Sequence, residues 1–381
     1  MVSCNSSNDV HETEIYHISP TMDDSRYTVI KTSQYTIDSL CTLGFPEDIR
    51  EMKPDKISTS DGRIYYLDTE ITRMLYVFDG NGALINKIGE RGRAKNEYVG
   101  YPDDFFVDSK GGLHVLDKLG EKIIVYDKNG IVENVMDISE YGSLHSFGLT
   151  GNDRYMMYYI SGFLDREDEE QETPITLMMF DEAFKSYTPL AYTNDKLYYD
   201  GTGHSFFQDA ERLSHIPIGS DSVYVYKNDV LEKIVHFDFG GKFFMKEHPD
   251  ILKNSFEMTK ATDNIFTNYK GVNNLTRYQE TDQLIFLEYN YQGRVFNWLY
   301  NKKTKYAING NCLFEGVNPY FYYFLRGNQI VAYIDTETVE TLKGFMHNDG
   351  FKENLEKSPQ QVKDLIEGKI KAPALFFMTM K

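Results

Sequence analysis

Charged and aromatic side chains with the chemistry of a binding site gather between Ile88 and Phe105, in a segment that separates two apolar runs. The residues that offer charge, stacking and hydrogen bonds there are Arg91, Arg93, Tyr98, Tyr101, Asp103 and Asp104. Arginine pairs with anions, tyrosine stacks on flat groups, and aspartate accepts hydrogen bonds. We predict that this segment contributes to a ligand-binding surface.

Three more residues are predicted to lie on the same face. Arg73 and Lys118 occupy equivalent loops of two sequence repeats, and His204 follows a Gly-Thr-Gly sequence in a connecting segment. Histidine in such a place suits acid–base chemistry as well as binding. The alternative interpretation of the connector residues, Arg73 and Lys118 is an exposed polar rim or a structural connector, and that of His204 is a loop histidine.

No motif of a familiar enzyme class occurs in the chain, since GxSxG, GxxxxGK[ST], HExxH and GxGxxG are all absent. Asp79 begins a segment like a calcium loop, but Leu84 stands where such a loop requires glycine, so we interpret it as a hairpin turn. The acidic run 165–170 has no ligand spacing. We therefore expect no catalytic residue, metal site or cofactor.

The formal net charge of −18 argues against two classes of partner. Proteins that bind nucleic acid or anionic lipid need clustered lysine and arginine, which neutralise phosphates. No apolar run reaches the length of about 18 residues that a membrane-spanning helix needs. We expect neither a nucleic-acid partner nor a membrane span.

A repeat of nearly 50 residues sets the expected architecture. The segment that ends at Asp68 recurs 49 positions later at Asp117, and the Asn-Gly turn at Asn81 recurs 48 positions later at Asn129. Each copy alternates apolar strands with tight turns, and four short strands in this length are typical of one propeller blade.

Weaker copies follow along the rest of the chain. The expected ends of the third strands are Phe78, Tyr126, Phe180, Tyr226, Tyr300 and Ile334. These positions predict an all-β fold, a six-bladed β-propeller of four-stranded antiparallel blades.

The two ends of the chain are expected to complete the last blade, because a propeller must pair its terminal edges. We expect Tyr27–Ile30 and Ala374–Met378 to supply its strands. Between them, Ser358 as N-cap, with Pro359 and Gln361, predicts a C-terminal helix over about 359–367 that ends at Gly368. The domain is expected to span 15–381 after a disordered tether over 1–14, with a helical insert at about 246–265.

Several motifs resemble a known family. They are the connector Lys87–Arg93 with Glu97–Tyr98, the blade entry Pro102–Asp108 and the final segment Ala372–Phe377. They are similar to those of NHL-like six-bladed β-propeller lipoproteins of Bacteroides and relatives, whose function is not established. Residues 94–96 depart from that family's Gly-Pro-Gly. The resemblance implies export, an N-terminal lipid anchor and a periplasmic or outer-membrane location.

The cysteines bear on this location. Cys4 follows a small residue and precedes a polar stretch, which resembles a lipoprotein cleavage site, so we predict lipidation at Cys4; the alternative is a chance cysteine in a disordered terminus. Cys41 and Cys312 have no CxxC spacing, and we expect two buried free thiols. Trp298, the single tryptophan, is expected in the core.

The sequence thus favours a non-catalytic binding or scaffolding module of the bacterial cell envelope. It would recognise a glycan, a peptide or an envelope protein through the inter-blade loops at one face. The first alternative is a metal-dependent hydrolase or lyase with its site at the axial funnel. The second is a structural subunit that docks through the insert at 246–265.

Overall fold

Strands form most of the regular structure, as the aromatic and β-branched runs of the sequence predict. The computed structural model describes residues 12–20, 28–30, 34–47, 49, 53–141, 144–163, 174–181, 184–192, 204–209, 212–249, 269–310, 312–314 and 322–381. The chain divides into two compact units. The first unit is formed by residues 1–21, 104–279 and 287–296, and the second by residues 22–103, 280–286 and 297–381.

Six sheets of four antiparallel strands are present within these ranges, and they confirm the predicted six-bladed β-propeller. Five of them are meanders in which consecutive strands pair. Their strands are β4 (Lys56–Ser60), β5 (Arg63–Asp68), β6 (Met74–Asp79) and β7 (Leu84–Ile88); β8 (Asp104–Val107), β9 (Leu113–Asp117), β10 (Lys122–Tyr126) and β11 (Val132–Asp137); β12 (Ser146–Leu149), β13 (Tyr155–Phe163), β14 (Ile175–Phe180) and β15 (Tyr187–Tyr192); β16 (Phe206–Asp209), β17 (Arg212–His215), β18 (Ser222–Lys227) and β19 (Val230–Asp238); and β20 (Val272–Glu280), β21 (Leu284–Tyr291), β22 (Arg294–Asn301) and β23 (Tyr306–Gly310).

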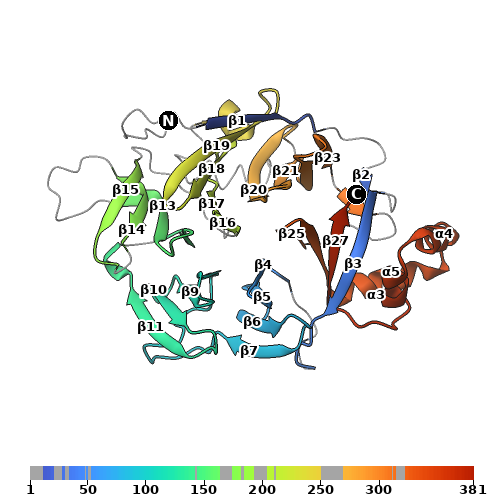
Figure 1. The fold of residues 1–381 in the computed structure, drawn as a ribbon, viewed down its shortest axis with the longest axis horizontal. Helices are drawn as coiled ribbons and strands as arrows, with labels where there is room; N and C mark the ends of the chain where they lie inside the picture. Colours follow the sequence, from blue (N-terminus) through green and yellow to red (C-terminus); the bar gives the residue numbers. More distant parts are fainter. Residues whose placement is uncertain are drawn as a thin grey trace. The chain divides into compact units, whose positions relative to one another are not determined.

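The last sheet is assembled differently from the others. Its order is β25 (Tyr322–Arg326), β26 (Gln329–Ile334), β27 (Ala374–Met380) and β3 (Tyr35–Thr42), so both ends of the chain contribute to it (Figure 1). The C-terminal strand was predicted correctly. Ile334, however, ends the second strand of this sheet, and not the third, which explains its short spacing from Tyr300.

The N-terminal strand of the last sheet was predicted at the wrong place. Residues 28–30 form β2 (Thr28–Ile30), which pairs in parallel with β24 (Cys312–Phe314), while β3 pairs with β27. β3 offers eight residues for pairing, and its Tyr35 and Cys41 are buried. The longer segment therefore takes the edge, because it pairs with β27 over more residues and forms more hydrogen bonds.

The expected tether over 1–14 does not extend to residue 14. β1 (Glu12–His17) includes residues 12–14 and adds a fifth, parallel strand beside β19. The Lys233 ammonium lies 2.8 Å from the Glu14 carboxylate across this pair. Residues 1–11, with the predicted lipidation site Cys4, lie outside the described residues.

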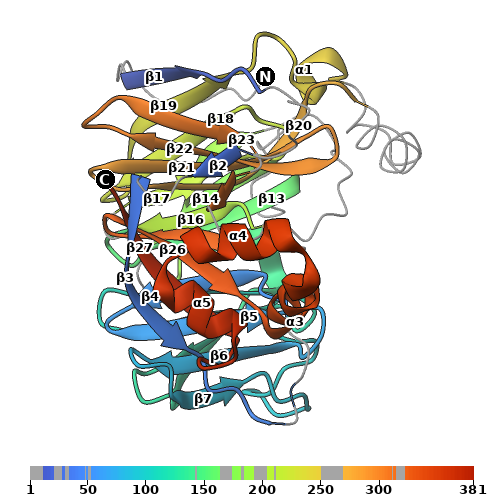
Figure 2. The same cartoon turned by 90° about the vertical axis from the view of Figure 1, so that its right-hand side faces the viewer.

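Helices interrupt the last sheet between β26 and β27. They are α3 (Thr336–Gly344), α4 (Asp349–Lys357) and α5 (Gln360–Ile366), with a 3-10 turn at Phe345–His347, and they pack beside one another (Figure 2). Another 3-10 turn covers Ser139–Tyr141. Of these three helices, the sequence predicted only α5.

The predicted cap of α5 is wrong, although its end is correct. Ser358 closes α4 and is buried, so Pro359 takes the N-cap position of α5 and no side chain caps it. Gly368 follows the helix with φ +78°, a conformation that glycine adopts without strain. The structure describes residues 246–249 of the predicted insert at 246–265. The short helix α1 (Phe244–Glu247) ends within them, and residues 250–268 lie outside the described residues.

Aspartates shape the hairpin turns of the repeat. The Asp79 carboxylate accepts hydrogen bonds from the backbone N–H groups of Asn81 and Ala83, both at 2.9 Å. Asp127 does the same for Asn129 and Ile131 in the next sheet. This geometry confirms a hairpin turn at the calcium-loop-like segment.

Other aspartates join neighbouring sheets of the first unit. Asp153, in the β12–β13 turn, accepts hydrogen bonds from the Ser109 N–H at 2.9 Å and from its hydroxyl at 2.5 Å. Asp229, in the β18–β19 turn, accepts from the Thr150 hydroxyl and from the Asn152 amide. Each of these turns is thereby fastened to the sheet that precedes it.

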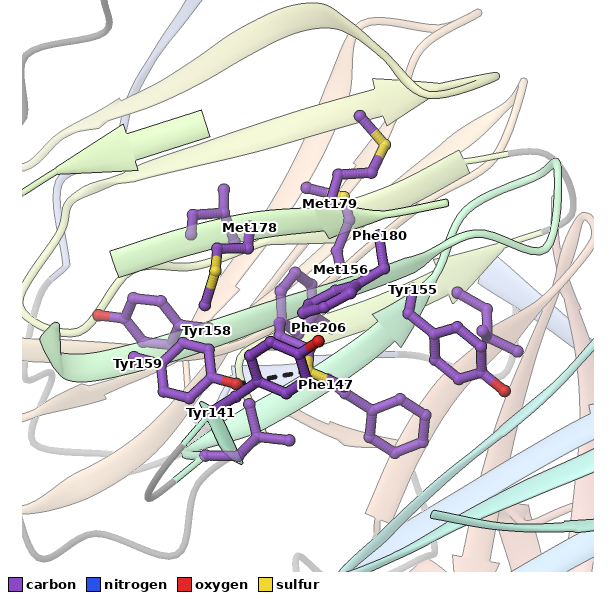
Figure 3. Close-up of a cluster of buried hydrophobic side chains, with 14 of the residues drawn as sticks. Tyr141, Phe147, Tyr155, Met156, Tyr158, Tyr159, Met178, Met179, Phe180 and Phe206 are labelled. Carbon is purple, nitrogen blue, oxygen red and sulfur yellow. Dashed lines mark hydrogen bonds between the residues drawn. The ribbon is translucent and has the colours of Figure 1, made fainter. Parts of the chain in front are cut away.

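Sulfur and aromatic side chains fill the core of the first unit. Met156, Met178 and Met179 belong to one buried cluster with Phe147 and Phe180 (Figure 3). Methionine fills irregular gaps and contacts rings favourably. In the second unit, Trp298 is 4% exposed, which confirms its core position, and Cys41 is buried and unbonded as predicted. The side chain of Cys312 lies outside the described residues.

The Asp68→Ala variant should be markedly less stable. The Asp68 side chain is fully buried and accepts hydrogen bonds from the N–H groups of Glu70, Ile71 and Thr72 and from the Thr72 hydroxyl. Its removal deprives four donors of their acceptor and leaves a cavity in the buried site of the carboxylate, so we expect the free energy of unfolding to fall by about 3 kcal/mol. Urea denaturation measures this. Asp127→Ala removes an equivalent acceptor from an exposed turn and should cost much less; equal losses would contradict the role of burial.

Candidate functional site

The connector between β7 and β8, residues 89–103, is braced by its own backbone. The Tyr98 N–H donates to the Glu90 carbonyl at 3.0 Å, and the Gly92 N–H donates to the Tyr98 carbonyl at 3.1 Å. Arg91 and Tyr98 form a parallel bridge. The Tyr98 ring is 1% exposed, so it anchors the connector in the core and does not offer the stacking surface that the sequence predicted.

A glutamate tightens the outer part of this connector. The Glu97 carboxylate accepts a hydrogen bond from the Ala94 N–H at 2.8 Å, and it occupies the space that any side chain at Gly92 would fill. A side chain at Gly92 would therefore displace the Glu97 carboxylate from this position. Residues 94–96, where the sequence departs from the related family, thus form a closed turn in this protein.

Three exposed arginines lie on the connector or contact it, and we name Arg73, Arg91 and Arg93 the arginine cluster: Arg91 and Arg93 belong to the connector, and Arg73 belongs to the β5–β6 loop. The Arg73 guanidinium lies 5.3 Å from the centroid of the half-buried Tyr101 ring, a cation–π contact. Arg91 Nη2 lies 3.5 Å from the Val99 carbonyl, and both Arg91 and Arg93 are exposed. Within the described part of the chain, no carboxylate forms an ion pair with any of the three. The arrangement can bind an anion.

The other residues that the sequence predicted for this surface do not form one group. Asp103 is half-buried at the end of the connector. Lys118, also half-buried, lies in the β9–β10 loop of the first unit, where its carbonyl accepts from the Glu121 N–H at 3.2 Å. Asp104 and His204 belong to the first unit as well, so we describe them as a second group.

Asp104 and His204 lie together. The His204 Nδ1 atom is 3.2 Å from Asp104 Oδ1, and their side chains are 14% and 2% exposed. Asp104 begins β8, and His204 stands just before β16. β12 contacts both of these strands, so the beginnings of three neighbouring strands meet here. The sequence predicted both residues but not their pairing.

Further polar side chains near these strand ends were missed by the sequence. Ser146 begins β12, opposite Tyr158 on β13, and the His215 ring packs against Tyr158 and Phe206 with centroids 4.7 and 4.6 Å apart. Ser146 Oγ and His215 Nδ1 are buried without a hydrogen-bond partner. Ser146 and His215 sit in apolar strands with no motif around them, so their meeting is visible only in three dimensions.

We name this second group the strand-entry group, and its members are Asp104, Ser146, His204 and His215. It offers hydrogen-bonding atoms and a histidine that is oriented by a carboxylate. Such a pair is the usual support for acid–base chemistry. Among the described residues, no three His, Cys, Asp or Glu side chains are placed to hold a metal ion. No helix within the described ranges is long and apolar enough to cross a membrane.

The chain belongs to the family described as "Domain of unknown function (DUF4934)", whose model matches residues 52–371. No curated protein sequence matches it. Its fold is similar to that of a Bacteroides fragilis protein provisionally assigned as exported, with a TM-score of 0.70 at 17% identity over 97% of this chain and 100% of that chain.

Two other structures show weaker similarity. One is a DUF4221 member from Bacteroides vulgatus, with a TM-score of 0.48, 13% identity, and coverage of 91% of this chain and 98% of that chain. The other is virginiamycin B lyase from Staphylococcus aureus, with a TM-score of 0.42, 8% identity, and coverage of 78% and 96%. The family match and the fold shared with the Bacteroides fragilis protein confirm the predicted relationship to uncharacterised propeller proteins of Bacteroides.

Protonation of His215 should couple folding to pH. Burial lowers the pKa of His215 to about 3. A hydrogen bond with the Ser205 backbone raises this pKa in part, and the nearby His145 lowers it. The unfolded chain, with a histidine pKa of about 6.5, therefore binds a proton between these values that the folded protein does not. Stability is then fully present at neutral pH and is lost as the pH falls below about 6.5.

We expect this histidine to remove about 2 kcal/mol from the free energy of unfolding between pH 7 and pH 5. Urea denaturation at several pH values, compared with the His215→Gln variant, isolates its contribution because the other histidines are common to both proteins. An identical pH dependence in the two proteins would show that His215 titrates normally in the folded state.

Proposed function

We propose that this DUF4934 protein is an exported, non-catalytic binding module of the bacterial cell envelope that recognises its partner through the β7–β8 connector. The partner is a glycan, a peptide or an envelope protein. The observation that carries the proposal is the connector itself, which is internally braced and yet exposes Arg91 and Arg93.

Rigid presentation is what a binding loop requires. A mobile loop loses conformational freedom when it binds, whereas a braced one has already paid that entropic cost during folding. Tyr98, Gly92 and Glu97 hold the connector by three backbone hydrogen bonds and one buried ring. In the described residues, Arg91 donates one long hydrogen bond, of 3.5 Å, to the Val99 carbonyl, and no ion pair holds Arg91 or Arg93.

Export and anchoring belong to the same proposal. The provisional assignment of the Bacteroides fragilis neighbour as exported supports a location outside the cytoplasm. Cys4 would carry the lipid anchor, which holds the domain at a membrane surface. Mass spectrometry of the protein from its native membrane tests the acylation of Cys4.

A glycan and peptide array probed with the purified protein tests the binding function. We expect at least one ligand class to bind, and the Arg91→Ala/Arg93→Ala variant to lose about tenfold or more in affinity, since each charge-assisted hydrogen bond contributes about 1.5 kcal/mol or more. The matched control is Lys110→Ala/Lys128→Ala, which removes the same charge from exposed turns. Equal losses in both variants would argue against a site on the connector.

The alternative function, a metal-dependent hydrolase or lyase, draws on one observation, the Asp104–His204 pair. Melting temperature measured with and without millimolar calcium or zinc separates the alternatives, because a bound ion stabilises the folded state. A binding module should melt at the same temperature under all conditions. A rise that the Asp104→Asn variant abolishes would favour the enzyme.

A further inference from the structure

We infer that the strand-entry group is a second binding site, which takes a hydroxyl group of a neutral sugar between Ser146 and His215. All of its residues belong to the first unit, so it is distinct from the β7–β8 connector of the second unit and does not depend on the proposed function. The inference begins with two side chains that are each 2% exposed. In the described part of the chain, Ser146 Oγ and His215 Nδ1 have no hydrogen-bond partner.

Ser146 and His215 face the same packed layer between two neighbouring sheets. Residues directly opposite in an antiparallel pair point to the same face of the sheet, and Ser146 is opposite Tyr158. The Tyr158 ring packs against the His215 ring with centroids 4.7 Å apart. Gly148 follows Ser146 on the same face of β12, and a Cβ atom on it would lie 2.9 Å from Leu213, two residues before His215. The two unpartnered atoms therefore belong to one layer.

The two atoms have complementary needs. Burial lowers the pKa of His215 to about 3, so its ring is neutral at pH 7. The ring donates a hydrogen bond to the Ser205 backbone, and because Nδ1 has no partner the donor is Nε2. Nδ1 is then an acceptor only, whereas the Ser146 hydroxyl both donates and accepts. One hydroxyl group satisfies both, because it donates to Nδ1 and accepts from Ser146 Oγ.

The charges around the site favour a neutral ligand over an anion. The buried Asp104 carboxylate lies 3.2 Å from His204 Nδ1, and the neutral His215 ring supplies no positive charge. A negative ligand group would be repelled by this carboxylate at low dielectric constant. A hydroxyl group also loses far less hydration energy on burial than a charged group does.

Two histidines lie nearer to solvent than the buried pair. His145 and His204 are half-buried, whereas the residues that follow them, Ser146 and Ser205, are buried. The His145 ring contacts the Tyr158 ring, with centroids 5.7 Å apart. A ligand therefore approaches from the side where β12 and β16 begin. Hydrogen-bonding groups at two depths suit a sugar, which carries several hydroxyl groups.

The stability of the Ser146→Ala variant gives the first test. A buried hydroxyl without a partner has lost its hydration and gained no hydrogen bond, so it weakens the fold. We expect Ser146→Ala to melt at the same temperature as the unmodified protein or at a higher one. A serine that holds the structure together would give the opposite result.

Binding of the full-length protein to four monosaccharides gives the second test, measured by isothermal titration calorimetry at pH 7. Glucose and galactose are neutral, glucuronate is acidic, and glucosamine carries an amine that is protonated in part. We expect glucose, galactose or both to bind, and glucuronate to bind at least about tenfold more weakly than they do, since the carboxylate repels it.

Matched variants locate the bound sugar. Ser146→Ala and His215→Phe should each reduce its affinity about tenfold or more, because each leaves the ligand hydroxyl with one hydrogen bond fewer. The control is Ser214→Ala. Ser214 is buried beside His215 but points to the opposite face of β17, so its removal should leave the affinity unchanged.

Three results would overturn the inference. If none of the four sugars binds and Ser146→Ala melts several degrees lower, a buried water molecule satisfies the two atoms and the site takes no ligand. Equal losses of affinity in Ser146→Ala and Ser214→Ala would place the sugar elsewhere. Tighter binding of glucosamine or glucuronate than of the neutral sugars would assign a charged ligand. Should His215→Phe fail to fold, Ser146→Ala and the ranking of the sugars still decide the question.

Discussion

Burial of both faces of each sheet is the constraint on which the remaining structure depends. In β9, β10 and β14, every residue is buried, including those that point to opposite faces. A strand that lies against solvent on one side alternates apolar and polar residues, and these strands do not. Each sheet must therefore be covered on two sides, which a single blade cannot achieve by itself.

Several buried or partly buried aspartates of this protein hold loops and turns in place. Asp68 and Asp117 are fully buried and bind backbone N–H groups in the loops that follow their strands. Asp153 and Asp229 join the turns of one sheet to the next. Several of the acidic residues that contribute to the net charge of −18 thus have structural hydrogen-bond partners. Composition alone does not show which acidic residues have such partners.

The aspartate turns explain why the repeat was visible in the sequence. Asp79 and Asp127 make the same hydrogen bonds 48 residues apart, so the same local chemistry is required in each sheet. The last sheet has no such requirement, because its third and fourth strands are β27 and β3 from the two ends of the chain. Residues 28–30 and Tyr35–Thr42 were both candidates for its edge strand. Which of them pairs with β27 depends on contacts with the other end of the chain, and local sequence patterns do not show these contacts.

The sequence by itself determined the fold class, the number of blades and the place of the connector, because hairpin turns and strand pairing within a blade are local. It also identified Asp104 and His204, although not their contact. Only the tertiary structure placed Tyr98 in the core, brought Arg73 over Tyr101, and left Ser146 and His215 buried with unsatisfied polar atoms. These outcomes depend on which side chains meet across separate strands and loops, and that is decided by the packing of whole sheets.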